Sequence, residues 1–202
     1  KNRFGPADEV GCFDLTDDGI VGLPDPSGLF LAHGNKPVPG TCVTVTMEGR
    51  RALVTEVQAL VTGSEQTNPR RATSGVDGAR TAMLLAVLQR SLGITLSKHE
   101  VYAATVGGVR LAEPASDLAL ALAITSTARD LSVVPGLVAI GEVGLAGEIR
   151  PVSSMRGRLA EAARLGFSVA LVPPDCSVDS VPIRTVEVED IRDAARRAIP
   201  PL

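Results

Sequence analysis

A serine flanked by carboxylates stands immediately before the most apolar run of the chain. Ser116 lies between Glu113 and Asp117, and no polar residue occurs from Leu118 to Ile124. Pro114 suits the first turn of a helix, and serine and acidic residues favour a helix N-terminus through capping and the helix dipole. Because the run is apolar nearly all round, we expect a buried central helix. Ser116 is then either a catalytic nucleophile or a cap and core filler.

A nucleophilic serine needs a neighbouring group that accepts its proton. Histidine and lysine are the usual acceptors, but the chain holds only two histidines and the lysines Lys1, Lys36 and Lys98. We expect Lys1 on a tail, Lys36 in a linker and Lys98 on another edge of the fold. Arginine cannot substitute, because its guanidinium stays protonated and has no acceptor lone pair. We therefore interpret Ser116 as cap or core filler, with a serine peptidase that uses an atypical base as the alternative.

Two arginine doublets are the candidates for binding an anionic backbone. Arg70 and Arg71 follow a proline in an expected polar loop, and Arg50 and Arg51 occupy an expected hairpin tip. Guanidinium groups make fixed contacts to phosphate, so these four residues and Arg80 are the candidate DNA-binding residues. The net charge of −3 does not indicate nucleic-acid binding in bulk, and exposed arginine doublets taken alone are usually solvated surface.

The elements that position these groups follow from hydrophobic patterning. Alternating apolar runs around turn signals predict hairpins within 11–23, 42–60 and 137–152. Apolar residues at helical spacing predict helices over 79–92, from 116, from 153 and from 191. Hairpins mixed with helices predict an α+β fold rather than a doubly wound sheet.

Composition limits the class of protein. The 202 residues are 45% hydrophobic, enough for a substantial core, and no apolar run reaches the ~18 residues of a membrane span. Three widely spaced cysteines, none in a CxxC pair, indicate a reducing cytoplasm and no zinc site. No Walker A sequence is present, and the glycines of 141–147 fall in a hairpin, which disfavours a third possibility, a phosphotransferase. We expect no metal or cofactor in this chain.

The opening segment, Lys1, Asn2, Arg3, Phe4 and Gly5, resembles the signature motif of the bacterial RadA (Sms) recombination proteins, and so does most of the chain. That family joins a zinc finger, a RecA-like ATPase and a C-terminal Lon-protease-like domain. The resemblance implies that 1–34 is the end of the ATPase lobe and that 35–202 is the Lon-like domain, a two-layer fold of ribosomal-protein type. The motif would couple nucleotide state to DNA movement, with ATP, Mg²⁺ and Zn²⁺ bound by parts of the parent outside this chain.

Residues 38–174 resemble the Lon protease domain, with Ser116 at the place of its nucleophile and Arg156 at the place of its lysine base. Arginine in that place implies a degenerate, non-proteolytic site. The resemblance further implies a homohexameric ring that binds DNA, within a cytoplasmic DNA-dependent ATPase or branch-migration helicase of recombinational repair. A RecA-type recombinase is an expected partner, and no membrane is.

Overall fold

The computed structural model describes residues 12–16, 19–23, 37–178 and 180–200. The motif at residues 1–5 and the expected boundary after residue 34 lie outside these ranges. The elements, in chain order, are β1 (Cys12–Thr16), β2 (Gly19–Leu23), β3 (Thr41–Glu48), β4 (Arg51–Gly63), β5 (Arg71–Ser74), α1 (Gly78–Leu92), β6 (His99–Thr105), the short 3-10 turns η2 (Val106–Gly108) and η3 (Pro114–Ser116), α2 (Asp117–Arg129), β7 (Leu137–Ala139), β8 (Glu142–Val143), β9 (Ile149–Arg150), α3 (Met155–Arg164), β10 (Val169–Val172), β11 (Arg184–Glu187) and α4 (Ile191–Ala198).

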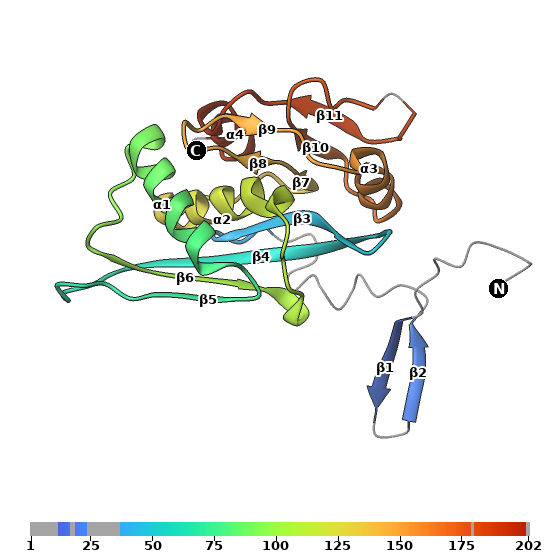
Figure 1. Cartoon of the computed structure of the whole chain (residues 1–202), viewed down its shortest axis with the longest axis horizontal. Helices are drawn as coiled ribbons and strands as arrows, with labels where there is room; N and C mark the ends of the chain where they lie inside the picture. Colours follow the sequence, from blue (N-terminus) through green and yellow to red (C-terminus); the bar gives the residue numbers. More distant parts are fainter. Residues whose placement is uncertain (1–11, 17–18, 24–36, 179, 201–202) are drawn as a thin grey trace, which may run out of the picture.

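A seven-stranded mixed sheet forms the centre, with the strand order β11-β10-β7-β3-β4-β6-β5 (Figure 1). The β3–β4 and β4–β6 pairs are antiparallel, while β5–β6, β3–β7, β7–β10 and β10–β11 are parallel. The predicted hairpins β1–β2 and β3–β4 are confirmed. The mostly parallel sheet and its helices make the fold mixed α/β, which is compatible with the expected α+β class, although more of the strand pairs are parallel than the predicted hairpins implied.

The short strand β7 shows why one hairpin prediction was wrong. Residues 137–141 were expected to pair with 148–152, but Leu137–Ala139 enters the main sheet between β3 and β10. Its three residues are all buried, Leu137 and Ala139 in one core cluster and Val138 in the other. A strand buried on both faces is typical of parallel pairing. Only the two-residue strands β8 and β9 form the hairpin there.

The predicted central helix is confirmed as α2. Every residue from Leu118 to Ile124 is at most 4% exposed, and the helix ends at Asp130, which adopts a left-handed backbone conformation. Helix α2 packs against β3 and β4 and is flanked by α1 and α4. The other predicted helices are confirmed as α1, α3 and α4.

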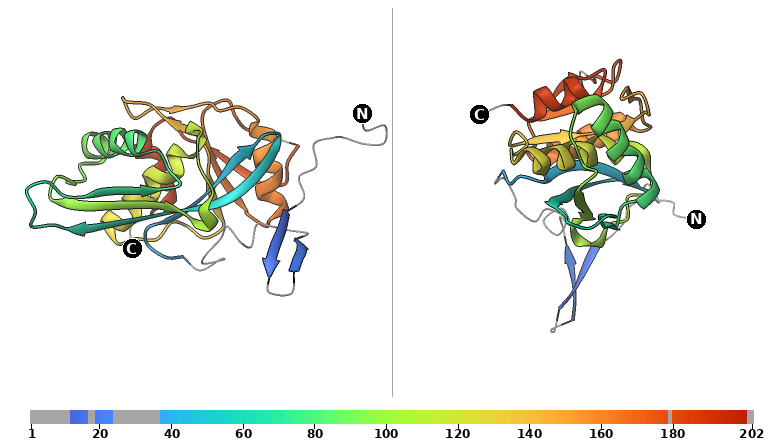
Figure 2. Two further views of the ribbon diagram at one scale, coloured as in Figure 1. Left: turned by 60° about the horizontal axis from the view of Figure 1, so that its bottom comes forward. Right: turned by 90° about the vertical axis from the view of Figure 1, so that its left-hand side faces the viewer.

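Helix α3 gives the fold a third layer at one end. It contacts β3 and β4, and its Leu159 packs in a cluster with Val45 and Val54, separate from the α2 cluster. Helices α1 and α3 lie toward opposite ends of the molecule (Figure 2). The expected two-layer arrangement therefore holds only at the β4–β6–β5 end, where no described helix covers the second face of the sheet.

Candidate functional site

Ser116 occupies the tight turn that leads into α2. Its side chain is buried, with the residue 7% exposed, and its hydroxyl donates to the carbonyl oxygen of Glu113 at 3.3 Å. The residue holds the N-cap position of α2 but makes no side-chain capping bond. Of the two structural roles expected for Ser116, cap or core filler, its burial and the missing capping bond favour the core filler.

The carboxylate after Ser116 is tied to an arginine of another helix. Asp117, only 3% exposed, accepts hydrogen bonds from Nε of Arg80 at 2.9 Å, from Nη2 of Arg80, and from the backbone N–H of Val143 at 3.3 Å. Burial raises the pKa of the Asp117 carboxyl, and the hydrogen bonds from Arg80 oppose that rise. Arg80 also lies 3.9 Å from a carboxylate oxygen of Glu142.

The carboxylate before Ser116 is tied to a second arginine. Arg158 is fully buried, and its Nη1 and Nη2 donate to the two carboxylate oxygens of Glu113 at 2.7 and 2.6 Å. Its remaining donors reach the carbonyl oxygens of Ser153 at 2.9 Å and Val45 at 2.5 Å. The Glu113 carboxylate also accepts from the backbone N–H of Met47 at 2.8 Å.

The ionised form of Glu113 is favoured by this arrangement. Burial alone would raise the pKa of Glu113, but hydrogen bonds from Arg158, Met47 and Thr46 outweigh it and hold the pKa below its ordinary value. The pair joins η3, β3 and the start of α3, segments distant in sequence. Glu113 was expected to favour a helix N-terminus, whereas its carboxylate is used to join these segments.

Arg156 lies away from this turn. Its side chain is exposed and lines a shallow depression of about 350 Å³ with Ala160 and Val181. Within residues 37–178 and 180–200, no hydrogen bond or ion pair joins Arg156 to Ser116. The arginine that reaches the serine turn is Arg158, two positions further along α3.

Among the described residues, no lysine or histidine belongs to the serine turn. Of the lysines and histidines, Lys98 and His99 lie in the described part of the chain; His99 begins β6 and Lys98 immediately precedes it. The described residues also contain no group of three or more potential metal-ligating side chains. The glycines of 141–147 form the β8–β9 hairpin, and no helix begins there, as expected for a segment that is not a phosphate-binding loop.

The two arginine doublets lie at opposite ends of β4. Arg50 and Arg51 stand at the tip of the β3–β4 hairpin, whereas Arg70 and Arg71 follow the loop beyond the far end of β4 (Figure 1). Arg71 is level with Val61 across β6, ten residues along β4 from Arg51, so at about 3.3 Å per residue the doublets are roughly 33 Å apart. They are therefore two separate clusters in one chain.

Lys98 lies in the same cluster as Arg70, although the sequence pattern predicted it on another edge of the fold. The antiparallel pairing of β4 with β6 places Gly63 opposite His99, and the N–H of Ser64 donates to the carbonyl oxygen of Lys98 at 2.9 Å. Lys98, Arg70 and Arg71 are all exposed at this end of the sheet. The registers of the β4–β6 and β5–β6 pairs together place them at the same end of the sheet.

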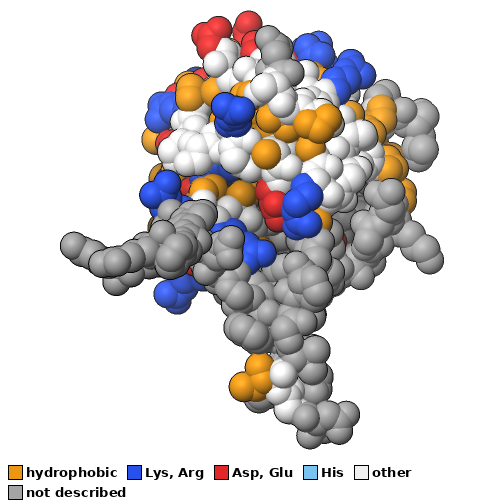
Figure 3. All heavy atoms as spheres, turned by 90° about the vertical axis from the view of Figure 1, so that its right-hand side faces the viewer, with side chains coloured by type: hydrophobic (Ala, Val, Ile, Leu, Met, Phe, Trp, Pro, Cys, Tyr) orange, Lys and Arg blue, Asp and Glu red, His pale blue; other side chains and the backbone are white. Residues whose placement is uncertain are grey.

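The members of this cluster differ in how firmly they are held. Arg71 begins the edge strand β5, and its Nη2 donates to the carbonyl oxygen of Leu96 at 3.1 Å. Arg70 contributes a positive charge that lowers the pKa of Tyr102, against a larger rise caused by the hydrogen bond of Tyr102 to Glu100. The opposite end of the molecule, seen in Figure 3, carries dispersed basic side chains interspersed with acidic and apolar groups.

Known proteins resemble this chain over most of its length. The DNA repair protein RadA of Mycolicibacterium smegmatis is 51% identical over 196 residues, which cover 97% of this chain and 42% of that protein. The DNA repair protein RadA of Mycobacterium tuberculosis is 54% identical over 182 residues, covering 90% of this chain and 38% of that protein. That of Synechocystis is 43% identical over 201 residues, covering 99% and 40%.

These matches span only part of each relative. The chain accounts for about two fifths of the length of the RadA proteins it matches. No family model matches the chain. No helix among the described residues is long and apolar enough to cross a bilayer.

Proposed function

We propose, from the premise that this chain belongs to the RadA family of bacterial DNA repair proteins, that it is the ring-forming and DNA-binding part of a DNA-dependent ATPase that drives branch migration in recombinational repair. The observation that supports the proposal is the pair of arginine–carboxylate ion pairs on either side of Ser116. Each flanking carboxylate is bound by an arginine, Glu113 by Arg158 and Asp117 by Arg80. The turn is thereby fixed as a structural element.

The proposal treats the fold as Lon-like with an inactive centre. The serine turn precedes a buried helix, and the β8–β9 hairpin precedes α3, the order expected from the resemblance. A peptidase would need an acceptor for the Ser116 proton, whereas the hydroxyl is spent on the Glu113 carbonyl oxygen. The chain itself is then not an enzyme, and peptide hydrolysis is not among its functions.

DNA binding is assigned to the cluster of Arg70, Arg71 and Lys98. Guanidinium groups that keep exposed donors suit phosphate contacts, which give affinity without sequence preference. In a hexamer this cluster would recur six times around one annulus and the Arg50–Arg51 doublet around another. Arg80 is the weakest of the candidates, because its partly exposed side chain is already bound to Asp117.

The remaining roles belong to the whole protein. The Lys1–Gly5 motif would couple nucleotide state to DNA movement, ATP with Mg²⁺ and Zn²⁺ would bind in the parts of the parent outside this chain, and a RecA-type recombinase would be its partner. The same proposal places the chain in the cytoplasm, with the DNA.

The test measures duplex DNA binding by the double variant Arg70→Ala/Arg71→Ala across a salt series. We expect affinity to fall about equally for unrelated sequences and the salt slope to become shallower, since each lost phosphate contact reduces the slope by about 0.9. The matched control is Arg196→Ala/Arg197→Ala, which removes the same charge from a doublet already bound to Asp193. Unchanged affinity and slope in the first variant would reject the cluster as the DNA contact.

A further inference from the structure

An acidic side chain lies next to the basic cluster of Arg70, Arg71 and Lys98. Arg71 pairs with Val101 in the β5–β6 ladder, and the N–H of Val101 donates to the carbonyl oxygen of Arg70 at 3.0 Å. Arg70 therefore lies beside Glu100, one residue earlier on each strand. Adjacent strands are about 4.8 Å apart, and side chains at the same level point to the same face. The carboxylate of Glu100 is thus close enough to pair with the guanidinium of Arg70.

The carboxylate of Glu100 is instead bound to two hydroxyl groups. The hydroxyl of Tyr102 donates to one of its oxygens at 2.6 Å, and that of Ser64 donates to the other at 3.3 Å. The bond from Tyr102 has the length of a charge-assisted hydrogen bond. In the part of the chain that the structure describes, no hydrogen bond or ion pair joins Glu100 to Arg70.

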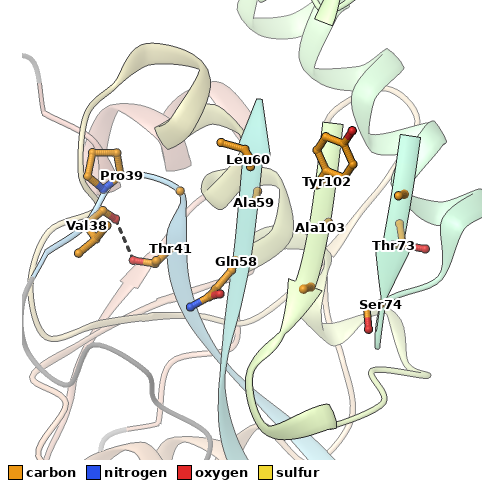
Figure 4. A pocket seen from close by; sticks show the side chains of 13 residues that line it. Val38, Pro39, Thr41, Gln58, Ala59, Leu60, Thr73, Ser74, Tyr102 and Ala103 are labelled. Carbon is orange, nitrogen blue, oxygen red and sulfur yellow. Dashed lines mark hydrogen bonds between the residues drawn. The ribbon is translucent and has the colours of Figure 1, made fainter. Parts of the chain in front are cut away.

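Tyr102 is placed by the strand to make this bond. It follows Glu100 by two residues on β6, so both side chains lie on the same face of the sheet. Figure 4 shows the Tyr102 hydroxyl turned toward the start of β6, the end at which Glu100 lies. The hydrogen bond to Glu100 raises the pKa of Tyr102, and the positive charge of Arg70 lowers it. The tyrosine hydroxyl is therefore close to both charges.

The guanidinium of Arg70 keeps its donors available in this arrangement. Its side chain is exposed and, among the residues described, takes part in no hydrogen bond or ion pair. Arg71, in contrast, has one donor bound to the carbonyl oxygen of Leu96. A guanidinium bound to a carboxylate offers less charge and fewer donors to a phosphate. The availability of Arg70 therefore depends on where the carboxylate of Glu100 is held.

We propose that Tyr102 is a positioning residue for DNA binding, whose hydroxyl, together with that of Ser64, holds the carboxylate of Glu100 away from Arg70 and leaves Arg70 available for a backbone phosphate. This inference rests on the proposed function, because it identifies what controls one of the assigned DNA contacts. Arg70 contacts the DNA, and Tyr102 acts through Glu100. Loss of the tyrosine hydroxyl frees the carboxylate to pair with Arg70 and to repel the phosphate.

The test measures binding of one DNA duplex by Tyr102→Phe, by Glu100→Gln and by the double variant across a salt series. Tyr102→Phe should weaken binding by about eightfold at 0.1 M salt for one lost phosphate contact, with a salt slope shallower by about 0.9. Glu100→Gln keeps an oxygen that accepts from Tyr102 and removes a negative charge beside the cluster, so it should bind at least as tightly as the wild type. The double variant should bind like Glu100→Gln, because no carboxylate is left to be released.

Two further variants locate the effect. In an Arg70→Ala background, which lacks the cation, adding Tyr102→Phe should cause no further loss of affinity. Ser177→Ala removes a matched hydroxyl, which donates to the carboxylate of Glu187 at 2.7 Å on the opposite edge strand of the sheet, and it should bind DNA like the wild type. Circular dichroism and the melting temperature of each variant show that it is folded.

The outcomes separate this inference from the proposed function. If Arg70→Ala weakens binding and Tyr102→Phe does not, Arg70 contacts DNA without the help of Tyr102, and the inference alone fails. It also fails if the double variant with Glu100→Gln binds as weakly as Tyr102→Phe, because a released carboxylate is then not the cause. A further loss on adding Tyr102→Phe to Arg70→Ala would likewise overturn it. If Arg70→Ala binds like the wild type, Arg70 is not a DNA contact, which overturns both.

Discussion

Arg158 and Arg70 show how one residue type serves two purposes in this fold. Arg158 is fully buried and binds both oxygens of Glu113 as well as two carbonyl oxygens. Arg70 is exposed at the far end of the sheet, beside Lys98 and Arg71. The difference lies in carboxylate partners and burial, not in the residue. An arginine inside the fold joins segments, and an arginine at its edge is available for a ligand.

The largest expected effect comes from removing the buried arginine. Arg158→Ala leaves the Glu113 carboxylate partly buried without its cation, and we expect unfolding in urea to show a loss of about 3–5 kcal/mol. Arg158→Lys keeps the positive charge but cannot bind both carboxylate oxygens as the planar guanidinium does, so it should lose less stability than Arg158→Ala. A loss of unfolding free energy below about 1 kcal/mol in Arg158→Ala would mean that the Arg158–Glu113 ion pair does not stabilise the fold.

The acidic partner should make stability depend on pH. The folded pKa of Glu113 is lowered, so its contribution is present above the unfolded pKa of about 4.3 and is lost as the pH falls through the folded value. We expect Glu113→Gln to be less stable than the wild type by about 2 kcal/mol at pH 7 and the difference to shrink below pH 4. The control is Glu65→Gln in the exposed 64–70 loop. A difference that does not depend on pH would contradict the ion pair.

Loss of the partly exposed arginine should matter less. Arg80→Ala leaves Asp117 buried, but the pKa of Asp117 is already raised, and the group can take up a proton. We expect a loss of about 1–2 kcal/mol at pH 7. Since a raised folded pKa stabilises the protonated form, the loss should become smaller as the pH falls. A loss that grows at low pH would contradict this assignment of the Asp117 proton.

Ser116→Ala should have the smallest effect. Its hydroxyl makes one described hydrogen bond, of 3.3 Å, so we expect the free energy of unfolding to change by less than about 1 kcal/mol. Peptide hydrolysis should be absent with or without the hydroxyl. Turnover of a fluorogenic peptide by the wild type that disappears in Ser116→Ala would establish the peptidase alternative.

The elements that could be predicted from the sequence are those whose signals lie within a short stretch of residues. The residues that signal the apolar run of α2 are close to one another in sequence, and so are those that signal the turn between β3 and β4; both elements were predicted. The two ion pairs could not be predicted, because Arg158 is 45 residues from Glu113 and Arg80 is 37 residues from Asp117. Ion pairs at that separation depend on sheet order, which the pattern of apolar residues does not encode.

The parallel strands were missed for a related reason. The three residues of β7 are too few to show alternation, and their burial on both faces depends on α3 covering the second face. Lys98 was likewise placed on another edge until the register of β4 with β6 brought it beside Ser64.

The most direct test measures unfolding free energy and duplex DNA affinity on the same two variants, Arg158→Ala and Arg70→Ala/Arg71→Ala. We predict that the first loses stability while its folded fraction binds DNA like the wild type. The second should keep wild-type stability within about 0.5 kcal/mol and lose affinity with a shallower salt slope. Loss of affinity in folded Arg158→Ala, with the doublet variant binding normally, would contradict the division between structural and DNA-binding arginines.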